Sequence, residues 1–249
     1  MRAPDKPGSG APFDQRMADI VRSGKLRVAL FPSFMYAKKP GTGELTGVAV
    51  EITRALCERL GVEAVLIEFL SPPNVIEGFK AGACDVAFLG IDPIRANDVD
   101  FSSPLMRADF TYLVPAESSI SRIEEADRPD VRIALVRGHA MDTALRGKLR
   151  QAKAVYTDTP DAAFALLQRA EVNVVAGIRP GLLAYASRLP GSRVLDDRYG
   201  SNTIAMAVPK GQAERLAYVA DFITEAKASG LAQRALAVAG LRGIEIPVG

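Results

Sequence analysis

The sequence predicts an α/β fold of two lobes, each with a central, mostly parallel sheet flanked by helices, joined by a two-strand hinge. Short apolar runs of strand length alternate with segments of helical periodicity, an order typical of parallel sheets with right-handed crossovers. This strand-and-helix unit occurs before residue 115 and again after residue 130. We therefore expect residues 1–23 to form an N-terminal lead and helix, residues 24–114 plus 205–249 to form lobe 1, and residues 115–204 to form lobe 2.

The composition excludes several classes of protein. The chain has 249 residues, of which 48% are hydrophobic and 24% charged, as in ordinary globular proteins. Its 31 basic and 29 acidic residues are dispersed, so the basic stripe that nucleic acid requires is missing. No apolar run approaches the roughly 20 residues of a membrane span, and residues 1–12 lack the apolar core of a secretory signal. Either the protein is cytosolic or a signal has been removed.

Cysteine and histidine are too few for a metal site. Cys57 and Cys84 are the only cysteines and the chain has a single histidine, so we expect neither metal nor cofactor. Both cysteines fall in segments with the pattern of buried elements, which favours two unreactive core thiols. A disulfide between them stays open if the protein is exported.

The predicted elements of the first lobe follow from apolar spacing and turn residues. Apolar residues with helical spacing run from Val48 to Leu60, and Gly61 ends that helix. The polar stretch between the residues 38 and 46 contains a Pro-Gly turn and reads as a hairpin. The other predicted elements are a helix at 13–22, strands at 26–30, 62–69 and 85–89, and a helix at 75–80.

The second lobe repeats this order after a polar, loosely patterned segment at 117–129. We predict strands at 111–115, 131–136, 155–156 and 172–176, with helices at 141–149, 161–169 and 180–188. A strand at 203–208 and two helices at 216–229 and 231–239 then return to the first lobe. The two crossings between the lobes make a hinge.

The residues from Cys84 to Pro104 carry the strongest functional signal. A short buried strand ends at Gly90 and Asp92, and Pro93 then opens a helical turn that contains Arg95. A guanidinium at the carboxyl end of a strand, beside backbone N–H groups, is suited to bind a carboxylate in a bidentate manner. A surface arginine that caps a turn is the alternative.

These residues also carry a resemblance. The run from Gly82 to Pro104, G-x-x-D-V-A-F-x-G followed by R-x-x-x-V-D-F-S-x-P, resembles the central signature of the family 3 extracellular solute-binding proteins. The closing segments A-V-P-K-G and K-A-S-G resemble the same family. The resemblance implies a periplasmic-binding-protein type 2 fold that closes around a ligand by hinge motion, and an ABC permease as partner. It also implies that Arg95 grips the ligand carboxylate.

The resemblance extends to further site residues. In this family the loop after the first strand lines the pocket, which places the aromatic Phe34 and Tyr36 against the ligand. A second-lobe glycine followed by hydroxyl residues at a helix N-terminus corresponds to Gly138, His139 and Ala140, whose backbone N–H groups can point at an anion. The predicted ligand-binding residues are Phe34, Tyr36, Gly90, Asp92, Arg95, His139, Ala140 and Arg179.

One position departs from the family pattern. Receptors for α-amino acids carry an acid just after the second-lobe strand that corresponds to residues 172–176, and here the sequence reads Gly177-Ile178-Arg179. An arginine beside a ligand ammonium would be repulsive in a partly desolvated cleft. We therefore expect an aromatic or hydrophobic carboxylate, or a dicarboxylate, in place of a zwitterionic amino acid.

Three function classes follow. The first is a monomeric periplasmic receptor that delivers a small organic anion to an ABC permease; a receptor for an amino acid with an atypical site is a variant of it. The second is an enzyme like cyclohexadienyl dehydratase, with Glu44, Glu68 and Asp92 as the candidate acids. The third is a sensor domain, which no DNA-binding or membrane segment accompanies.

Overall fold

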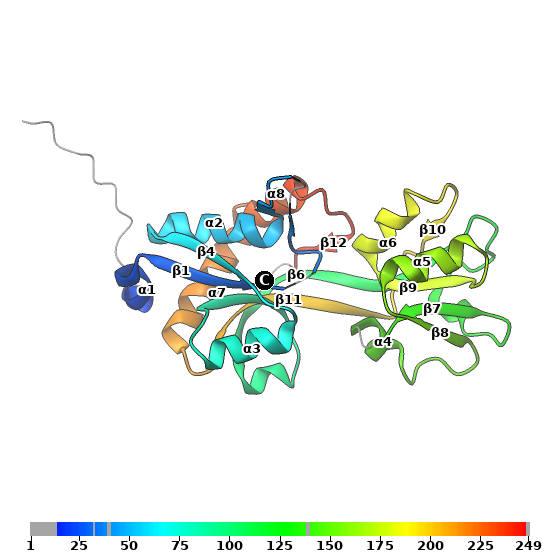
Figure 1. Ribbon diagram of the computed structural model, residues 1–249, viewed down its shortest axis with the longest axis horizontal. Helices are drawn as coiled ribbons and strands as arrows, with labels where there is room; N and C mark the ends of the chain where they lie inside the picture. The colour runs from blue at the N-terminus through cyan, green and yellow to red at the C-terminus, as the bar shows by residue number, and fades with distance from the viewer. Residues whose placement is uncertain (1–13, 32, 39–40, 138–139, 248–249) are drawn as a thin grey trace, which may run out of the picture. The chain divides into compact units, whose positions relative to one another are not determined.

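The computed structural model describes residues 14–31, 33–38, 41–137 and 140–247 (Figure 1). By their packing these residues form two compact units. The described residues within 1–105 and 205–239 form unit 1, and those within 106–204 and 240–247 form unit 2. Two long strands, β6 (Val99–Val114) and β11 (Gly200–Pro209), each contribute residues to both units.

The observed boundaries differ from the expected ones at three places. The first division between the units falls after Leu105, within the continuous strand β6, and not after residue 114. Residues 240–247 pack with unit 2, because β12 (Ile244–Glu245) pairs with β6 at Arg107 and Ala108. The N-terminal helices η1 (Gln15–Met17) and α1 (Ala18–Ser23) belong to unit 1, where η1 packs against helix α7 (Ala213–Ala228).

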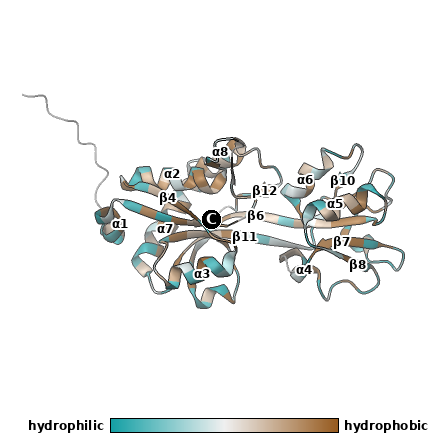
Figure 2. Cartoon of the chain, viewed as in Figure 1, coloured by the Kyte–Doolittle hydropathy of each residue, from teal (hydrophilic) through white to brown (hydrophobic). Residues whose placement is uncertain are grey.

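Unit 1 is built on the strand order β4-β1-β5-β11-β6, and β1 is parallel to both β4 and β5. Strand β5 is buried along its whole length, and Figure 2 shows how apolar residues concentrate in the central strands. Helix α2 packs against α8, β1 and β4, while α3 packs its residues Val75, Ile76 and Phe79 on β1 and β5. The bounds are β1 Lys25–Leu30, β4 Glu63–Glu68, β5 Val86–Gly90, α2 Val48–Leu60, α3 Pro72–Lys80, α7 Ala213–Ala228 and α8 Leu231–Val238.

Two helix starts in unit 1 differ from the expectation. Helix α3 begins at Pro72, three residues before the predicted start, because proline is preorganised for the first turn and Ser71 serves as the N-cap. Helix α7 likewise begins at Ala213 and not at Leu216. The predicted hairpin is present as the antiparallel pair of β2 (Ala37–Lys38) and β3 (Leu45–Thr46).

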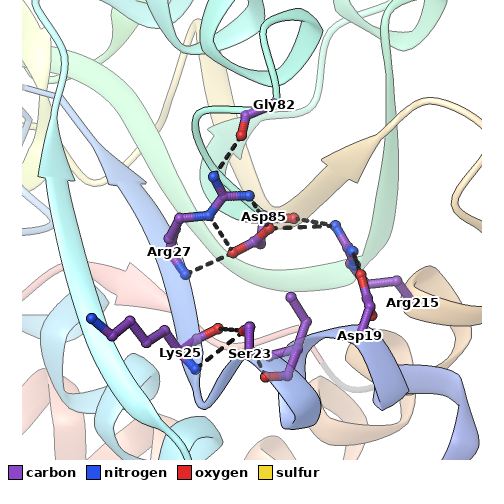
Figure 3. Close-up of polar contacts among 8 residues, drawn as sticks. Asp19, Ser23, Lys25, Arg27, Gly82, Asp85 and Arg215 are labelled. Atoms are coloured by element: carbon purple, nitrogen blue, oxygen red, sulfur yellow. Dashed lines mark hydrogen bonds and ion pairs between the residues drawn. The ribbon is translucent and has the colours of Figure 1, made fainter.

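A buried charge network joins the amino ends of β1 and β5 to helices α1 and α7 (Figure 3). The Asp85 carboxylate accepts hydrogen bonds from the Arg27 side chain at 2.7 and 3.0 Å and from its backbone N–H at 2.8 Å. Arg215 on α7 donates to the Asp85 carbonyl and to the Asp19 carboxylate on α1. The side chains of Asp85 and Arg215 are almost wholly buried. This network ties the first and the last parts of unit 1 together.

Unit 2 has the strand order β6-β9-β7-β8, in which β7, β8 and β9 are parallel and β6 is antiparallel to β9. One apolar cluster includes α4 residues, and another packs Phe164 of α5 and Leu182 of α6 against Val175 of β9. The remaining bounds are η3 Ile123–Ala126, β7 Arg132–Val136, α4 Ala140–Leu145, β8 Lys153–Thr157, α5 Pro160–Gln168, β9 Val174–Ile178, α6 Arg179–Ala186 and β10 Arg193–Val194. Within the described residues, no helix is both long and apolar enough to cross a membrane.

Candidate functional site

The predicted site residues of unit 1 gather at one edge of its sheet. Strands β1, β4 and β5 are parallel, so their carboxyl ends at Leu30, Glu68 and Gly90 lie along the same edge. The loops that follow them carry Phe34 and Tyr36 from the first strand and Asp92 and Arg95 from the third. This edge is where open α/β sheets bind ligands.

Arg95 begins the short 3-10 helix η2 (Arg95–Asn97), one turn beyond the end of β5. Its Nη1 donates a hydrogen bond to the carbonyl oxygen of Gly90, 2.9 Å away. Within the described part of the chain, no further hydrogen bond of this side chain is found, so other N–H groups of the guanidinium can meet an anion. The half-buried side chain is therefore both held in place and available for binding.

The Asp92 carboxylate is hydrogen-bonded within the turn that leads into Arg95. One oxygen of its carboxylate accepts hydrogen bonds from the backbone N–H groups of Ile94 at 2.8 Å and Arg95 at 3.2 Å. This is the arrangement by which Asp fixes a turn onto a helical segment. Asp92 thus orients Arg95, and a direct ligand contact by Asp92 would compete with these two bonds.

The loop after β1 is held close to the start of α2. Gly47, with φ of 118°, lies so near the chain that a Cβ there would approach the Met35 carbonyl to 2.7 Å. The Met35 carbonyl also accepts a hydrogen bond from the Ala49 N–H. This close approach needs glycine and fixes the residues that flank Met35, namely Phe34 and Tyr36.

Tyr36 points its hydroxyl to the end of the neighbouring parallel strand. The phenol donates to Glu68 Oε1 at 3.1 Å, and burial together with the Glu68 carboxylate raises the pKa of Tyr36. Phe34 is half-buried and keeps part of its ring exposed. Both aromatic side chains therefore belong to the same edge as Arg95.

The sequence analysis missed three exposed apolar side chains at this edge. Leu70 is 86% exposed, Ile94 78% and Ile91 42%, and each follows the end of β4 or β5. The strands that precede them end on the same edge of the sheet as the strand before Arg95, so these side chains add apolar surface to that edge. Their position just beyond the end of an apolar strand was the available signal.

The predicted site residues of unit 2 are only partly described by the structure. His139 lies outside the described residues, and Ala140 is the exposed first residue of α4. Strands β7, β8 and β9 are parallel and end at Val136, Thr157 and Ile178, so the loops after them share one edge of the unit 2 sheet.

Arg179 is engaged within unit 2, which speaks against the predicted ligand contact. Its guanidinium donates to the carbonyl oxygens of Leu195 at 2.8 Å, Asp196 at 2.8 Å and Asp197 at 3.2 Å. Only 13% of its side chain is exposed, and Gly243 packs against the aliphatic stem. The strand β9 runs two residues further than predicted, which places Arg179 at the start of α6 and turns it toward the 195–197 segment.

Asp109 lies on β6 beside the end of β9. Because Phe110 of β6 pairs with Ile178, Asp109 lies opposite Arg179. Its carboxylate is shared by Arg198 at 3.2 Å, Arg179 at 3.6 Å and Arg107 at 3.8 Å. Three guanidinium groups thus surround one acid, so Asp109 does not offer an unopposed negative charge to an ammonium group.

The candidate acids of the dehydratase alternative each have partners. Glu44 forms an ion pair with Arg54 at 3.3 Å, Glu68 accepts from Tyr36, and Asp92 caps the turn before Arg95. No group of acidic, cysteine or histidine side chains in the described residues has the arrangement of a metal site. Cys57 and Cys84 are free and buried.

The chain belongs to the bacterial extracellular solute-binding proteins, family 3, whose sequence profile matches residues 26–237. The match spans both units, from the second residue of β1 to near the end of α8. The fold is the periplasmic-binding-protein type 2 fold, and the class is that of extracellular solute-binding proteins.

Three solved structures of similar fold are of amino acid-binding proteins. The ancestral amino acid-binding protein AncCDT-1, a precursor of cyclohexadienyl dehydratase, is 24% identical with a TM-score of 0.72, covering 89% of this chain and 97% of its own. An amino acid ABC transporter substrate-binding protein from Streptococcus pneumoniae bound to L-arginine is 23% identical with a TM-score of 0.70, covering 92% and 99%. The solute receptor for L-cysteine of Neisseria gonorrhoeae is 23% identical with a TM-score of 0.70, covering 90% and 92%. At these identities the likeness establishes the fold.

Proposed function

We propose that this protein is the periplasmic receptor of an ABC importer and captures a small organic anion, with Arg95 as the anchor for the ligand carboxylate. The observation that carries the proposal is the placement of Arg95 at the carboxyl edge of a parallel sheet, fixed through Gly90 and Asp92. Part of its guanidinium is left for a ligand, and a bidentate pair with a carboxylate is among the strongest polar contacts in proteins. Phe34 and Tyr36 supply apolar surface at the same edge.

The absence of an acid at the end of β9 favours a ligand without an ammonium group. Gly177 occupies a position where a Cβ would lie 2.8 Å from Leu182 Cδ2, so a carboxylate side chain does not fit there without a shift of Leu182. Asp109, the neighbouring acid, is neutralised by three arginines. An aromatic or hydrophobic carboxylate, or a dicarboxylate, fits these charges better than an amino acid.

An amino acid remains the competing ligand, because the similar solved structures are amino acid receptors. A thermal-shift screen separates the two: the twenty standard amino acids are compared with a panel of aromatic and aliphatic acids, and calorimetry follows for each hit. We expect stabilisation by acids only. Micromolar binding of a standard amino acid, with no response to the acids, would overturn the organic-anion proposal.

The protein is proposed to act without catalysis. The dehydratase alternative draws support from the ancestral precursor among the similar structures, so a turnover assay with prephenate and arogenate is the matching test. We expect no product from either.

We also propose that the protein is a monomer that docks on an ABC permease, and light scattering tests its mass. Closure of the lobes around the ligand stays a prediction, which small-angle scattering with and without ligand would test.

A further inference from the structure

Lys210, the residue that follows strand β11, is hydrogen-bonded to the turn that carries Arg95. Its ammonium donates to the carbonyl oxygen of Ala96 at 2.8 Å and to the Asp100 carboxylate at 2.7 Å. Its backbone N–H donates to the Asp98 carbonyl at 3.3 Å. Ala96 is the middle residue of η2 and Asp98 is the residue just after it, and all these residues belong to unit 1. Lys210 therefore holds η2 on its carboxyl side.

Asp100, near the start of β6, fixes the Lys210 ammonium in this position. One oxygen of its carboxylate accepts from the ammonium, and the other accepts from the backbone N–H of Gly211 at 2.8 Å. The hydrogen bond from Lys210 and then the one from Gly211 lower the pKa of Asp100, so the carboxylate is charged at neutral pH. Gly211 has a φ of 83°, a left-handed conformation that favours glycine. The Lys-Gly pair thus brings two donors to one acid.

Asp92 holds the same turn on its amino side. Its carboxylate accepts hydrogen bonds from the backbone N–H groups of Ile94 and Arg95. A single 3-10 turn makes few hydrogen bonds of its own, and these have poorer geometry than those of an α-helix. The backbone of η2 is therefore constrained from outside, by Asp92 at its start and by Lys210 at its end.

We propose that Lys210 is a positioning residue for the carboxylate anchor: by holding Ala96, it orders the Arg95 guanidinium in the free protein. The inference rests on the proposed function of Arg95 and assigns a further residue to the same site. A guanidinium that is ordered before binding loses less conformational entropy when it pairs with a carboxylate. Removal of the Lys210 ammonium should release the turn and weaken carboxylate binding, although Arg95 itself is unchanged.

NMR relaxation of the ligand-free protein tests the positioning directly. The Nε–H signal of Arg95, identified by its absence in Arg95→Ala, is followed in the wild type, Lys210→Met and Lys25→Met. Methionine keeps an unbranched side chain and removes the ammonium. Lys25 is the matched control, because its exposed 3.9 Å pair with Glu63 lies at the amino end of β1, the edge opposite to Arg95.

We expect an ordered Arg95 Nε–H in the wild type and in Lys25→Met, and faster motion on the picosecond-to-nanosecond scale in Lys210→Met. Asp100→Asn reaches the same contact from the other partner and should mobilise Arg95 in the same direction, which keeps the test decisive if Lys210→Met does not fold. Unchanged Arg95 mobility in a folded Lys210→Met or Asp100→Asn protein would overturn the proposal.

Calorimetry with phenylacetate measures the consequence for binding. We expect Lys210→Met to weaken binding by about three- to tenfold, the effect of ordering one long side chain on association. Lys25→Met should leave the affinity unchanged. Lys210→Cys alkylated with 2-bromoethylamine carries an ammonium again, on a side chain of nearly the original length, and should regain the affinity. The two native cysteines are buried, so the reagent meets the new one first.

The outcomes separate this role from that of the anchor. Weakened binding in Lys210→Met with an ordered Arg95 would show a direct ligand contact by Lys210 and overturn the positioning role. Unchanged affinity in Arg95→Ala would overturn the carboxylate anchor. A wild type that does not bind phenylacetate would count against the proposed function, and the NMR result would still decide whether Lys210 orders Arg95.

Discussion

Arg95 is tied to Gly90 by a hydrogen bond of 2.9 Å between its Nη1 and the carbonyl oxygen at the end of β5. The strand end thereby holds the guanidinium in one orientation before any ligand arrives. Preorganisation of this kind lowers the entropy cost of binding, since the side chain is already ordered.

Replacing Arg95 should therefore abolish most of the binding. We expect Arg95→Ala to weaken the best acid of the screen by about 2–5 kcal/mol, the range for breaking one side of a buried charged pair. Arg95→Lys keeps the charge but loses the two-pronged geometry of the guanidinium, so the affinity of this variant for the acid should lie between those of the wild type and of Arg95→Ala. Calorimetry measures both, and near wild-type affinity in a folded Arg95→Ala protein would refute the anchor role.

Arg179 should behave as a structural residue. Arg179→Met keeps most of the stem and removes the hydrogen bonds to the 195–197 segment, so we expect a loss of about 2–4 kcal/mol in the free energy of unfolding. Ligand affinity should change by less than about threefold if the variant is measured below its unfolding temperature. A large loss of affinity with unchanged stability would instead return Arg179 to the binding site.

The Asp85 network should dominate the stability of unit 1. Asp85→Ala leaves the buried Arg215 and the backbone N–H of Arg27 without their carboxylate, so we expect a loss of about 3–5 kcal/mol in urea unfolding. Glu63→Ala removes a partner of the exposed 3.9 Å pair with Lys25 and serves as the control, with a loss of no more than about 1 kcal/mol. Equal losses in the two variants would contradict the assignment of a buried network.

Acid should weaken unit 2 through Asp127. Burial opposes the ionisation of this carboxyl, but hydrogen bonds from the backbone N–H groups of Ala152, Gln151 and Arg150 outweigh it and hold the pKa of Asp127 below its ordinary value. Because the folded-state pKa lies below that of the unfolded chain, the ionised group stabilises the protein above the unfolded pKa. This contribution is lost as the pH falls through the folded pKa.

Urea unfolding of the wild type and of Asp127→Asn tests this pH dependence. The difference in unfolding free energy should be full at pH 7 and shrink below about pH 4. A difference that stays constant from pH 7 to pH 3 would show that the charge of Asp127 has no such role.

The two cysteines should resist modification in the native protein. Burial raises the pKa of Cys57 and of Cys84 to about 11, so roughly one thiol in a thousand is a thiolate at pH 8. We expect slow reaction with a thiol reagent in buffer and rapid labelling of two groups in 6–8 M urea, a range in which small proteins are commonly unfolded. Rapid native labelling would show that helix α2, which holds Cys57, or the segment between α3 and β5, which holds Cys84, opens readily.

Local patterns in the sequence predict much of the fold. Helix α2 is found at Val48–Leu60 as predicted, because its apolar stripe is complete and a glycine stands on each side. Strand β6 is longer than predicted, since the polar residues before Pro104 and the proline itself indicate a break. A proline can sit in a strand where its missing N–H is not needed by a neighbour, and that depends on the sheet and not on local sequence.

Some parts of the candidate site can be predicted from local sequence and others cannot. Arg95 follows the end of β5 within six residues, so the sequence predicts that the two are close together. The partners of Arg179 are carbonyl groups sixteen to eighteen residues away and an acid on β6, and no spacing rule connects them. The pocket of unit 2 that α5, α6 and the end of β9 border could not be predicted from the sequence either. The space beside Gly177 and Gly181 exists only once these two helices have packed on the sheet.

The order in which the two units use the chain has a consequence for biogenesis. Unit 2 takes almost all its residues from one continuous stretch, Met106–Ile204, whereas unit 1 needs Ala205–Ala239 for strand β11 and the helices α7 and α8. A chain that emerges N-terminus first therefore presents nearly all of unit 2 before unit 1 is complete. The strands β1, β4 and β5 of unit 1 cannot complete their sheet with β11 until the last fifth of the chain has been made. During that interval their apolar residues are exposed, which makes them the part of the chain most prone to aggregation.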